Sequence, residues 1–153
     1  MSCAVFQDIP EGTVQELCSR GRAVSYDAGQ KLFERGEDAK ELLILQEGTV
    51  DLLFPVQIMG VCREVPMEFK QAGDVVAWSA MVPPYHFTLS ARCASHSTVM
   101  ALSREAIYTF FETDAGTGYQ FMRNLAGVIG RRLQAMQVMW MRDLEASAVK
   151  RLG

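Results

Sequence analysis

Glycines divide the middle of the chain into short segments, and this pattern restricts the possible folds more than any other feature. Between Arg22 and Leu102, brief runs of β-prone residues alternate with five glycines: Gly29, Gly36, Gly48, Gly60 and Gly73. Glycine readily forms tight turns, and short strands separated by such turns are typical of antiparallel sheets. We therefore expect a compact antiparallel β structure from about residue 22 to about residue 102.

Two runs in this region alternate between apolar and polar residues, as strands with two different faces do. In the run 61–70 only Arg63 interrupts the apolar face. Pro66 has no N–H group to donate, so it predicts that this strand lies at a sheet edge or carries a bulge. The run 87–93 alternates in the same way and places Arg92 on the polar side of its strand.

Helical patterns flank the β region on both sides. Pro10 and Glu11 open a short predicted helix that closes near Gly21. After the β region, Ser103 is a suitable N-cap for a second short helix. From about residue 117, apolar residues then recur at spacings of three and four over more than six turns, which predicts one long C-terminal helix.

The second half of this long helix has little remaining chain to cover it. An exposed apolar stripe of this size is typical of an interface, and pairing with a second copy is the simplest cover. The predicted homodimer contacts are Ile129, Leu133, Met136, Trp140 and Leu144, with Arg131, Arg132, Arg142 and Asp143 on the polar flanks. The alternatives are that the stripe folds back as core or binds a protein partner.

Composition narrows the possible functions. The length of 153 residues fits a single domain, 1–153, with C-terminal helices over about 104–150. The net charge of −3 argues against direct nucleic-acid binding by this chain. No membrane span or signal peptide is apparent, so we expect a cytoplasmic protein. The four cysteines lack metal-ligand spacing, and no catalytic motif appears, so neither a metal site nor an enzyme is predicted.

Four segments in order resemble those of a known family. They are residues 26–30, 32–37, 43–50 and 73–76. In this order and spacing the chain resembles the cyclic nucleotide-binding domain family, specifically the effector half of Crp/Fnr-type bacterial regulators, over roughly residues 6 to 145. The resemblance implies an α+β, mainly β fold. Its centre is an antiparallel β-roll (double-stranded β-helix, jelly-roll-like), flanked by a short N-terminal helix and a long C-terminal dimerisation helix.

The resemblance also implies a ligand cassette, which begins at Gly73. In nucleotide-binding members the cassette reads like Phe-Gly-Glu-Leu-Ala, followed by an arginine before a Thr-bearing strand. The glutamate accepts from the ribose, and the arginine neutralises the phosphate. Aligned on Gly73, Ala77 occupies the glycine position and Trp78 the glutamate position. Aligned backward from Thr88, the arginine position falls on Tyr85, with His86 beside it.

Some residues of the cassette retain a chemistry suited to anions. The backbone amides of Ser79 and Ala80 start a predicted short helix and favour an anion there. His86 adds positive charge below about pH 6.5 if it faces inward. Arg92 replaces the missing arginine only if its side of the strand faces the pocket. These residues predict a degenerate site for a cyclic nucleotide or another small anionic ligand, or for no ligand.

Three functions follow from these observations. The first is a non-enzymatic, dimeric regulatory domain that senses a small ligand through its altered cassette. The second is a ligand-free interaction or scaffolding module, in which Trp78 fills the pocket. The third is the truncated effector domain of a Crp/Fnr-type transcription regulator, since such regulators continue into a helix-turn-helix domain.

Overall fold

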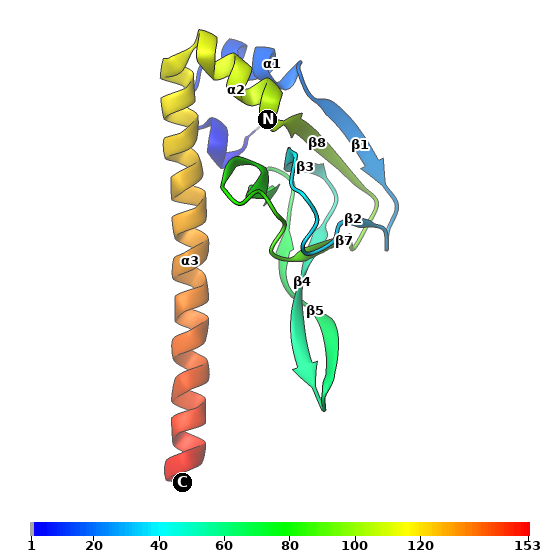
Figure 1. The fold of residues 1–153 in the computed structure, drawn as a ribbon, viewed down its shortest axis with the longest axis vertical. Helices are drawn as coiled ribbons and strands as arrows, with labels where there is room; N and C mark the ends of the chain where they lie inside the picture. The colour runs from blue at the N-terminus through cyan, green and yellow to red at the C-terminus, as the bar shows by residue number, and fades with distance from the viewer. Residues whose placement is uncertain (1) are drawn as a thin grey trace.

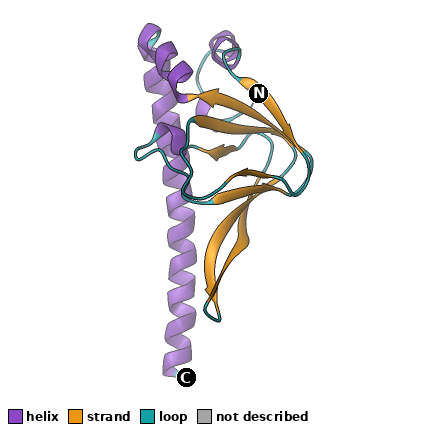
Figure 2. Ribbon diagram, turned by 45° about the vertical axis from the view of Figure 1, so that its right-hand side comes forward, coloured by secondary structure: helices purple, strands orange, loops and turns teal. Residues whose placement is uncertain are grey.

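The computed structural model describes residues 2–153 and contains two antiparallel four-stranded sheets (Figure 2). The strands are β1 (Arg22–Tyr26), β2 (Lys31–Phe33), β3 (Glu41–Glu47), β4 (Val50–Ile58), β5 (Val61–Lys70), β6 (Val75–Ala77), β7 (Ser90–Cys93) and β8 (Ser97–Ser103). One sheet has the order β1-β8-β3-β6 and the other β2-β7-β4-β5. The predicted α+β class with a β-roll at its centre is confirmed.

The glycines that separate the strands adopt the conformation predicted for turns. Gly29, Gly36, Gly48, Gly60 and Gly73 all have positive φ angles, between 80° and 93°. Side chains other than glycine rarely adopt this region. At Gly73 a Cβ atom would also lie 2.5 Å from the carbonyl oxygen of Ser2, so the cassette begins at a position that requires glycine.

Strand β3 separates two apolar cores. Its residues Leu43 and Leu45 pack between the two sheets, whereas Leu42 and Ile44 pack against the helices. This division follows from the period of two in a strand. The cassette strand β6 is also fully buried.

The helices pack against the first sheet and extend beyond it (Figure 1). They are η1 (Ala4–Phe6, 3-10), α1 (Glu11–Cys18), η2 (Ser79–Met81, 3-10), α2 (Arg104–Thr113) and α3 (Ala115–Leu152). The predicted cap is confirmed, because the Ser103 hydroxyl accepts from the Ala106 amide at 3.1 Å. The sequence did not predict η1. Asn124 of α3 fixes the C-terminal end of η1, because its side-chain amide donates to the carbonyls of Val5 and Gln7.

The hairpin of β4 and β5 forms a ribbon that projects alongside the second half of α3 (Figure 1). As predicted, β5 lies at a sheet edge and carries a bulge, since Glu68 pairs with Leu52 while Pro66 pairs with Leu53. The alternating apolar face of β5 does not contribute to the core, however. Val61, Met67 and Phe69 are at least half exposed.

Within residues 2–153, no helix combines the length and the apolar composition needed to cross a membrane.

Candidate functional site

The cassette forms a cleft between the two sheets, and this cleft is nearly closed. Ten residues line it: Phe33, Leu52, Val76, Ala77, Trp78, Ser79, Phe87, Thr88, Leu89 and Arg132. Its volume is about 10 Å³. A cavity of this size holds about one water molecule.

Two stacked phenylalanines occupy much of the cleft. Phe33 comes from β2 and Phe87 from the loop that leads to β7, and their ring centroids lie 3.9 Å apart with an interplanar angle of 12°. Both side chains are buried. A ligand that enters the cleft must therefore displace Phe87 and the loop that carries it.

Trp78 stands where the resemblance places the ribose-binding glutamate. Its indole borders the cleft, yet it also packs against the apolar core on the helix side of the first sheet. The next residue, Ser79, is buried and begins η2, which is a single turn of three residues.

Arg104 of α2 contacts the loop between β6 and β7 at two points, Ala80 and Tyr85, and the segment before β3 at Ala39. Its Nη1 donates to the carbonyls of Ala39 (3.3 Å) and Ala80 (3.1 Å), and its guanidinium lies 3.9 Å from the ring centroid of Tyr85. Tyr85 has a φ angle of 62°, which is uncommon for a residue other than glycine. Its carbonyl accepts from the Ala39 amide at 2.7 Å. The cassette is thus fixed directly to the start of α2.

The structure brings only some of the predicted site residues together. Ala77, Trp78, Ser79 and Thr88 border the cleft. His86 instead lies at the surface, with its Nδ1 3.0 Å from Asp38 Oδ1. Ala80 belongs to the core between the sheets.

Arg92 also lies away from the cleft. Its neighbours Ala91 and Cys93 are buried in the core between the sheets, and side chains alternate along a strand. Arg92 is therefore on the outer face of β7, where it is half-buried and paired in register with Lys31 and Asp51. Neither His86 nor Arg92 provides a positive charge among the lining residues.

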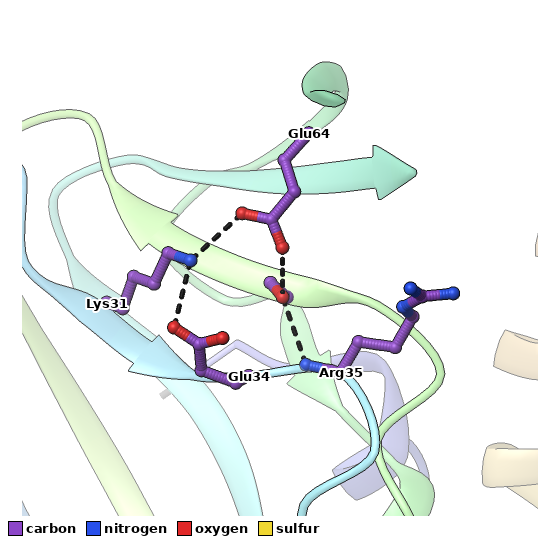
Figure 3. A network of polar contacts seen from close by, with 5 residues as sticks. Lys31, Glu34, Arg35 and Glu64 are labelled. Carbon is purple, nitrogen blue, oxygen red and sulfur yellow. Dashed lines mark hydrogen bonds and ion pairs between the residues drawn. The ribbon is translucent and has the colours of Figure 1, made fainter. Parts of the chain in front are cut away.

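A polar network holds the beginning of β7 (Figure 3). Lys31 Nζ lies 2.9 Å from both Glu64 Oε2 and Glu34 Oε1. The buried Ser90 hydroxyl donates to Glu64 Oε1 at 2.8 Å and accepts from the Arg35 amide at 3.0 Å. The hydrogen bond from Lys31, followed by that from Ser90, lowers the pKa of Glu64. Ser90, which alternation placed on the polar side of its strand, is therefore fully buried and hydrogen-bonded.

Arg132 of α3 is the charged residue that reaches the cleft. The sequence analysis placed it on a polar flank of the helix, but only 16% of its side chain is exposed. Its Nε lies 3.3 Å from Glu68 Oε2 without a hydrogen bond to any residue of 2–153. The period of α3 alone gave no signal of this, because the position of the β4–β5 ribbon decides which side of the helix is covered.

A groove of about 520 Å³ separates the β4–β5 ribbon from α3. Its apolar lining includes Phe54 and Met67 from the ribbon and Met136, Met139 and Trp140 from α3. Of the predicted dimer contacts, Met136 and Trp140 line this groove, Ile129 packs against the helix-side core, and Leu133 and Leu144 are exposed. The predicted stripe is thus divided, since part of it packs within the chain and part of it is exposed.

The described residues contain four free cysteines, and burial raises the pKa of Cys3, Cys18 and Cys93. Such thiols are poor nucleophiles. Within residues 2–153, no group of three or more His, Cys, Asp or Glu side chains is arranged to hold a metal ion.

The sequence matches the family model described as cyclic nucleotide-binding domain over residues 23–114. The chain belongs to the cyclic nucleotide-binding domain family. No curated protein matches it by sequence. The matched range contains both sheets except the first residue of β1, together with the whole cassette and α2.

Solved structures of the family share this fold. The catabolite activator protein of Thermus thermophilus has a TM-score of 0.75 and 19% identity, over 90% of this chain and 61% of that protein. A cyclic nucleotide-binding domain from Methylobacillus flagellatus KT has a TM-score of 0.76 and 19% identity, with coverage of 85% and 71%. The sensor domain of the transcriptional regulator DNR from Pseudomonas aeruginosa has a TM-score of 0.65 and 18% identity, with 87% of each chain covered. The chain thus spans about three fifths of the Thermus protein.

Proposed function

We propose that this chain is a non-enzymatic sensor domain whose altered cassette no longer binds cyclic AMP or cyclic GMP tightly and which signals as a dimer. The composition of the cleft supports this most strongly. Trp78 occupies the glutamate position, and Tyr85, at the arginine position, stacks on Arg104 instead of facing the cleft. Both groups that grip a cyclic nucleotide in the resemblance are therefore replaced.

The loop between β6 and β7 is the moving part of the proposed mechanism. A ligand that separates Phe33 from Phe87 displaces this loop, and Arg104 connects the same loop to α2. Helix α2 leads directly into α3. A ligand that favours the open cleft therefore shifts the population of helix arrangements, which is how a sensor transmits binding.

The partner in the proposed dimer is a second copy of α3. Dimerisation through this helix is what the likeness to Crp/Fnr sensor domains implies. The second half of α3 exposes large apolar side chains: Leu133, Val138, Met139, Trp140, Met141, Leu144, Val149 and Leu152. An unpartnered apolar surface of this extent is costly in water.

The second candidate is a ligand-free interaction module, and the cleft volume of about 10 Å³ favours it. In this case the domain acts through α3 alone. Trp78 would then be retained for packing against the helix-side core.

Titration calorimetry with cyclic AMP, cyclic GMP and cyclic dinucleotides tests the altered cassette. Losing a charge-assisted contact to a buried phosphate costs about 2–5 kcal/mol, and each 1.4 kcal/mol is tenfold in affinity. We therefore expect no micromolar affinity for either cyclic mononucleotide. Micromolar binding of cyclic AMP would refute the proposal.

Sedimentation equilibrium tests the dimer separately. Leu133→Asp and Leu144→Asp place a charge on the exposed part of α3, so both are expected to shift the chain to monomer. Met59→Asp, at the 98% exposed tip of the ribbon, is the matched control and should leave the dimer intact. A wild-type monomer at all concentrations would exclude signalling by dimerisation.

A further inference from the structure

The residues that line the cleft are apolar except for three. Of its ten lining residues, Ser79 and Thr88 carry hydroxyls, and Arg132 carries the only full charge. Ser79 begins η2, Thr88 precedes β7, and Arg132 comes from the middle of α3. A guanidinium and two hydroxyls are the groups that proteins commonly use to bind oxyanions.

The hydrogen-bonding capacity of Arg132 is poorly used within the chain. A guanidinium has five N–H donors in a planar fork. The Nε atom is buried, and among residues 2–153 it has no hydrogen-bond partner. Its ion-pair partner Glu68 is shared, because Glu68 Oε1 also lies 2.6 Å from Lys70 Nζ. A buried polar group without a hydrogen-bond partner is rare in native proteins, and a bound anion is one of the explanations for such a group.

The local charge balance favours an anion. Lys70 and Arg132 share a single carboxylate, so the cluster that they form with Glu68 has one excess positive charge. The side chains of Lys70 and Arg132 are each only 16% exposed. Water screens charges less at such positions, which strengthens the attraction for an anion.

We propose that Arg132, with the hydroxyls of Ser79 and Thr88, forms the anion-binding site of this domain and recognises a small molecule bearing a phosphate or carboxylate. This inference rests on the proposed sensor function and names its ligand class. Arg132 replaces, from α3, the positive charge that the cassette loop lacks. The ligand competes with Glu68 for the guanidinium, so binding releases the β4–β5 ribbon from α3.

Calorimetric titration with inorganic phosphate and with succinate, at constant ionic strength, provides the test. Arg132→Gln removes the guanidinium and should weaken binding about tenfold or more. Glu68→Gln removes the competing carboxylate and should tighten binding severalfold, an effect that a merely structural role would not produce. The exposed Arg142→Gln on the same helix is the control and should bind as the wild type does. Ser79→Ala should weaken binding if the anion lies in the cleft.

The outcomes separate the two proposals. Binding of phosphate but not of succinate identifies a phosphate-bearing ligand. Binding of succinate but not of phosphate identifies a ligand that bears a carboxylate. Equal affinity in wild type and Arg132→Gln would overturn the role of Arg132 and leave the sensor function standing. No response of the wild type to phosphate or succinate would also overturn this site, and it would leave the altered cassette to its own test, the titration with cyclic nucleotides. Circular dichroism checks that each variant folds. If Arg132→Gln does not fold, the tighter binding expected of Glu68→Gln still tests the proposal.

Discussion

At the scale of single residues, Arg104 connects more parts of the site than any predicted residue does. It contacts the carbonyl of Ala39, the carbonyl of Ala80 in η2, and the ring of Tyr85. The left-handed backbone of Tyr85 costs of the order of 1 kcal/mol or more and persists only where its surroundings hold it. Arg104 is therefore the residue that keeps the loop closed.

Replacing Arg104 with alanine should lower the free energy of unfolding by about 2 kcal/mol. Hydrogen bonds from a charged donor contribute about 1.5–3 kcal/mol, and the half-buried site reduces this only in part. Urea denaturation measures the change. Arg22→Ala, which removes an exposed ion pair with Glu41, is the control and should cost less than about 1 kcal/mol. Similar costs for both variants would contradict the role of Arg104.

Sequence reasoning found the site residues that adjoin one another in the chain. Ala77 is the last residue of β6, and Trp78 and Ser79 follow it directly, so the position of the strand also gave theirs. Arg132 was assigned to a solvated flank because its position depends on how α3 rotates against the ribbon. That rotation is fixed by packing between distant segments, which a helical period does not contain.

At the scale of elements, helix α3 has two halves with different support. The first half buries Phe121 and Leu125 in the helix-side core. The second half has one covered side, toward the ribbon groove, and its last residues Val149 and Leu152 are 70% and 90% exposed. A helix without tertiary packing is only marginally stable in water.

Amide hydrogen exchange at two protein concentrations should reveal this difference. Residues 117–128 are expected to be protected at both concentrations, because packing within one chain holds them. Residues 140–152 are expected to exchange quickly when dilute and to become protected at high concentration, since a second copy must cover them. Protection of both segments that does not change with concentration would contradict pairing through α3.

The start of α3 gives a pH dependence. The Asp114 carboxylate accepts from the hydroxyl and the amide of Thr117, at 2.6 and 3.1 Å, and these bonds lower its pKa. The stabilisation that the ionised carboxylate gives the fold is complete above the ordinary aspartate pKa of about 3.9. It is lost as the pH falls through the lower pKa of Asp114 in the folded chain. The stability difference between wild type and Asp114→Asn, measured by urea denaturation, should therefore decrease below about pH 4. A difference that stays constant down to pH 2 would contradict this.

At this scale, the turns and caps that depend on local backbone chemistry were predicted correctly, whereas the burial of each strand face could not be predicted. The five turn glycines and the Ser103 cap depend on one backbone conformation or one hydrogen bond each, and the structure contains them all. Pro66 correctly predicted that β5 lies at a sheet edge or carries a bulge. The alternation in β5 indicated that the two faces of the strand differ, but alternation does not show what covers either face.

At the scale of the whole molecule, the cleft, the ribbon and α3 meet at one ion pair. Arg132 lines both the cleft and the groove, and Glu68 holds it from the ribbon. An anion bound to Arg132 would free Glu68, and the ribbon could then move away from α3. The groove that widens includes Met136 and Trp140, which are among the predicted dimer contacts.

Anion binding and dimerisation should therefore be coupled. If phosphate strengthens the dimer by some factor, dimerisation must strengthen phosphate binding by the same factor, because coupling free energies are reciprocal. We expect a factor of about five or more, the lower end of typical coupling. Sedimentation equilibrium with and without phosphate measures one side, and phosphate titration above and below the dimer dissociation constant measures the other. In Glu68→Gln the ribbon is already released, so phosphate should bind without changing the dimer. Equal dimer affinity with and without phosphate in the wild type would show that the two sites act independently.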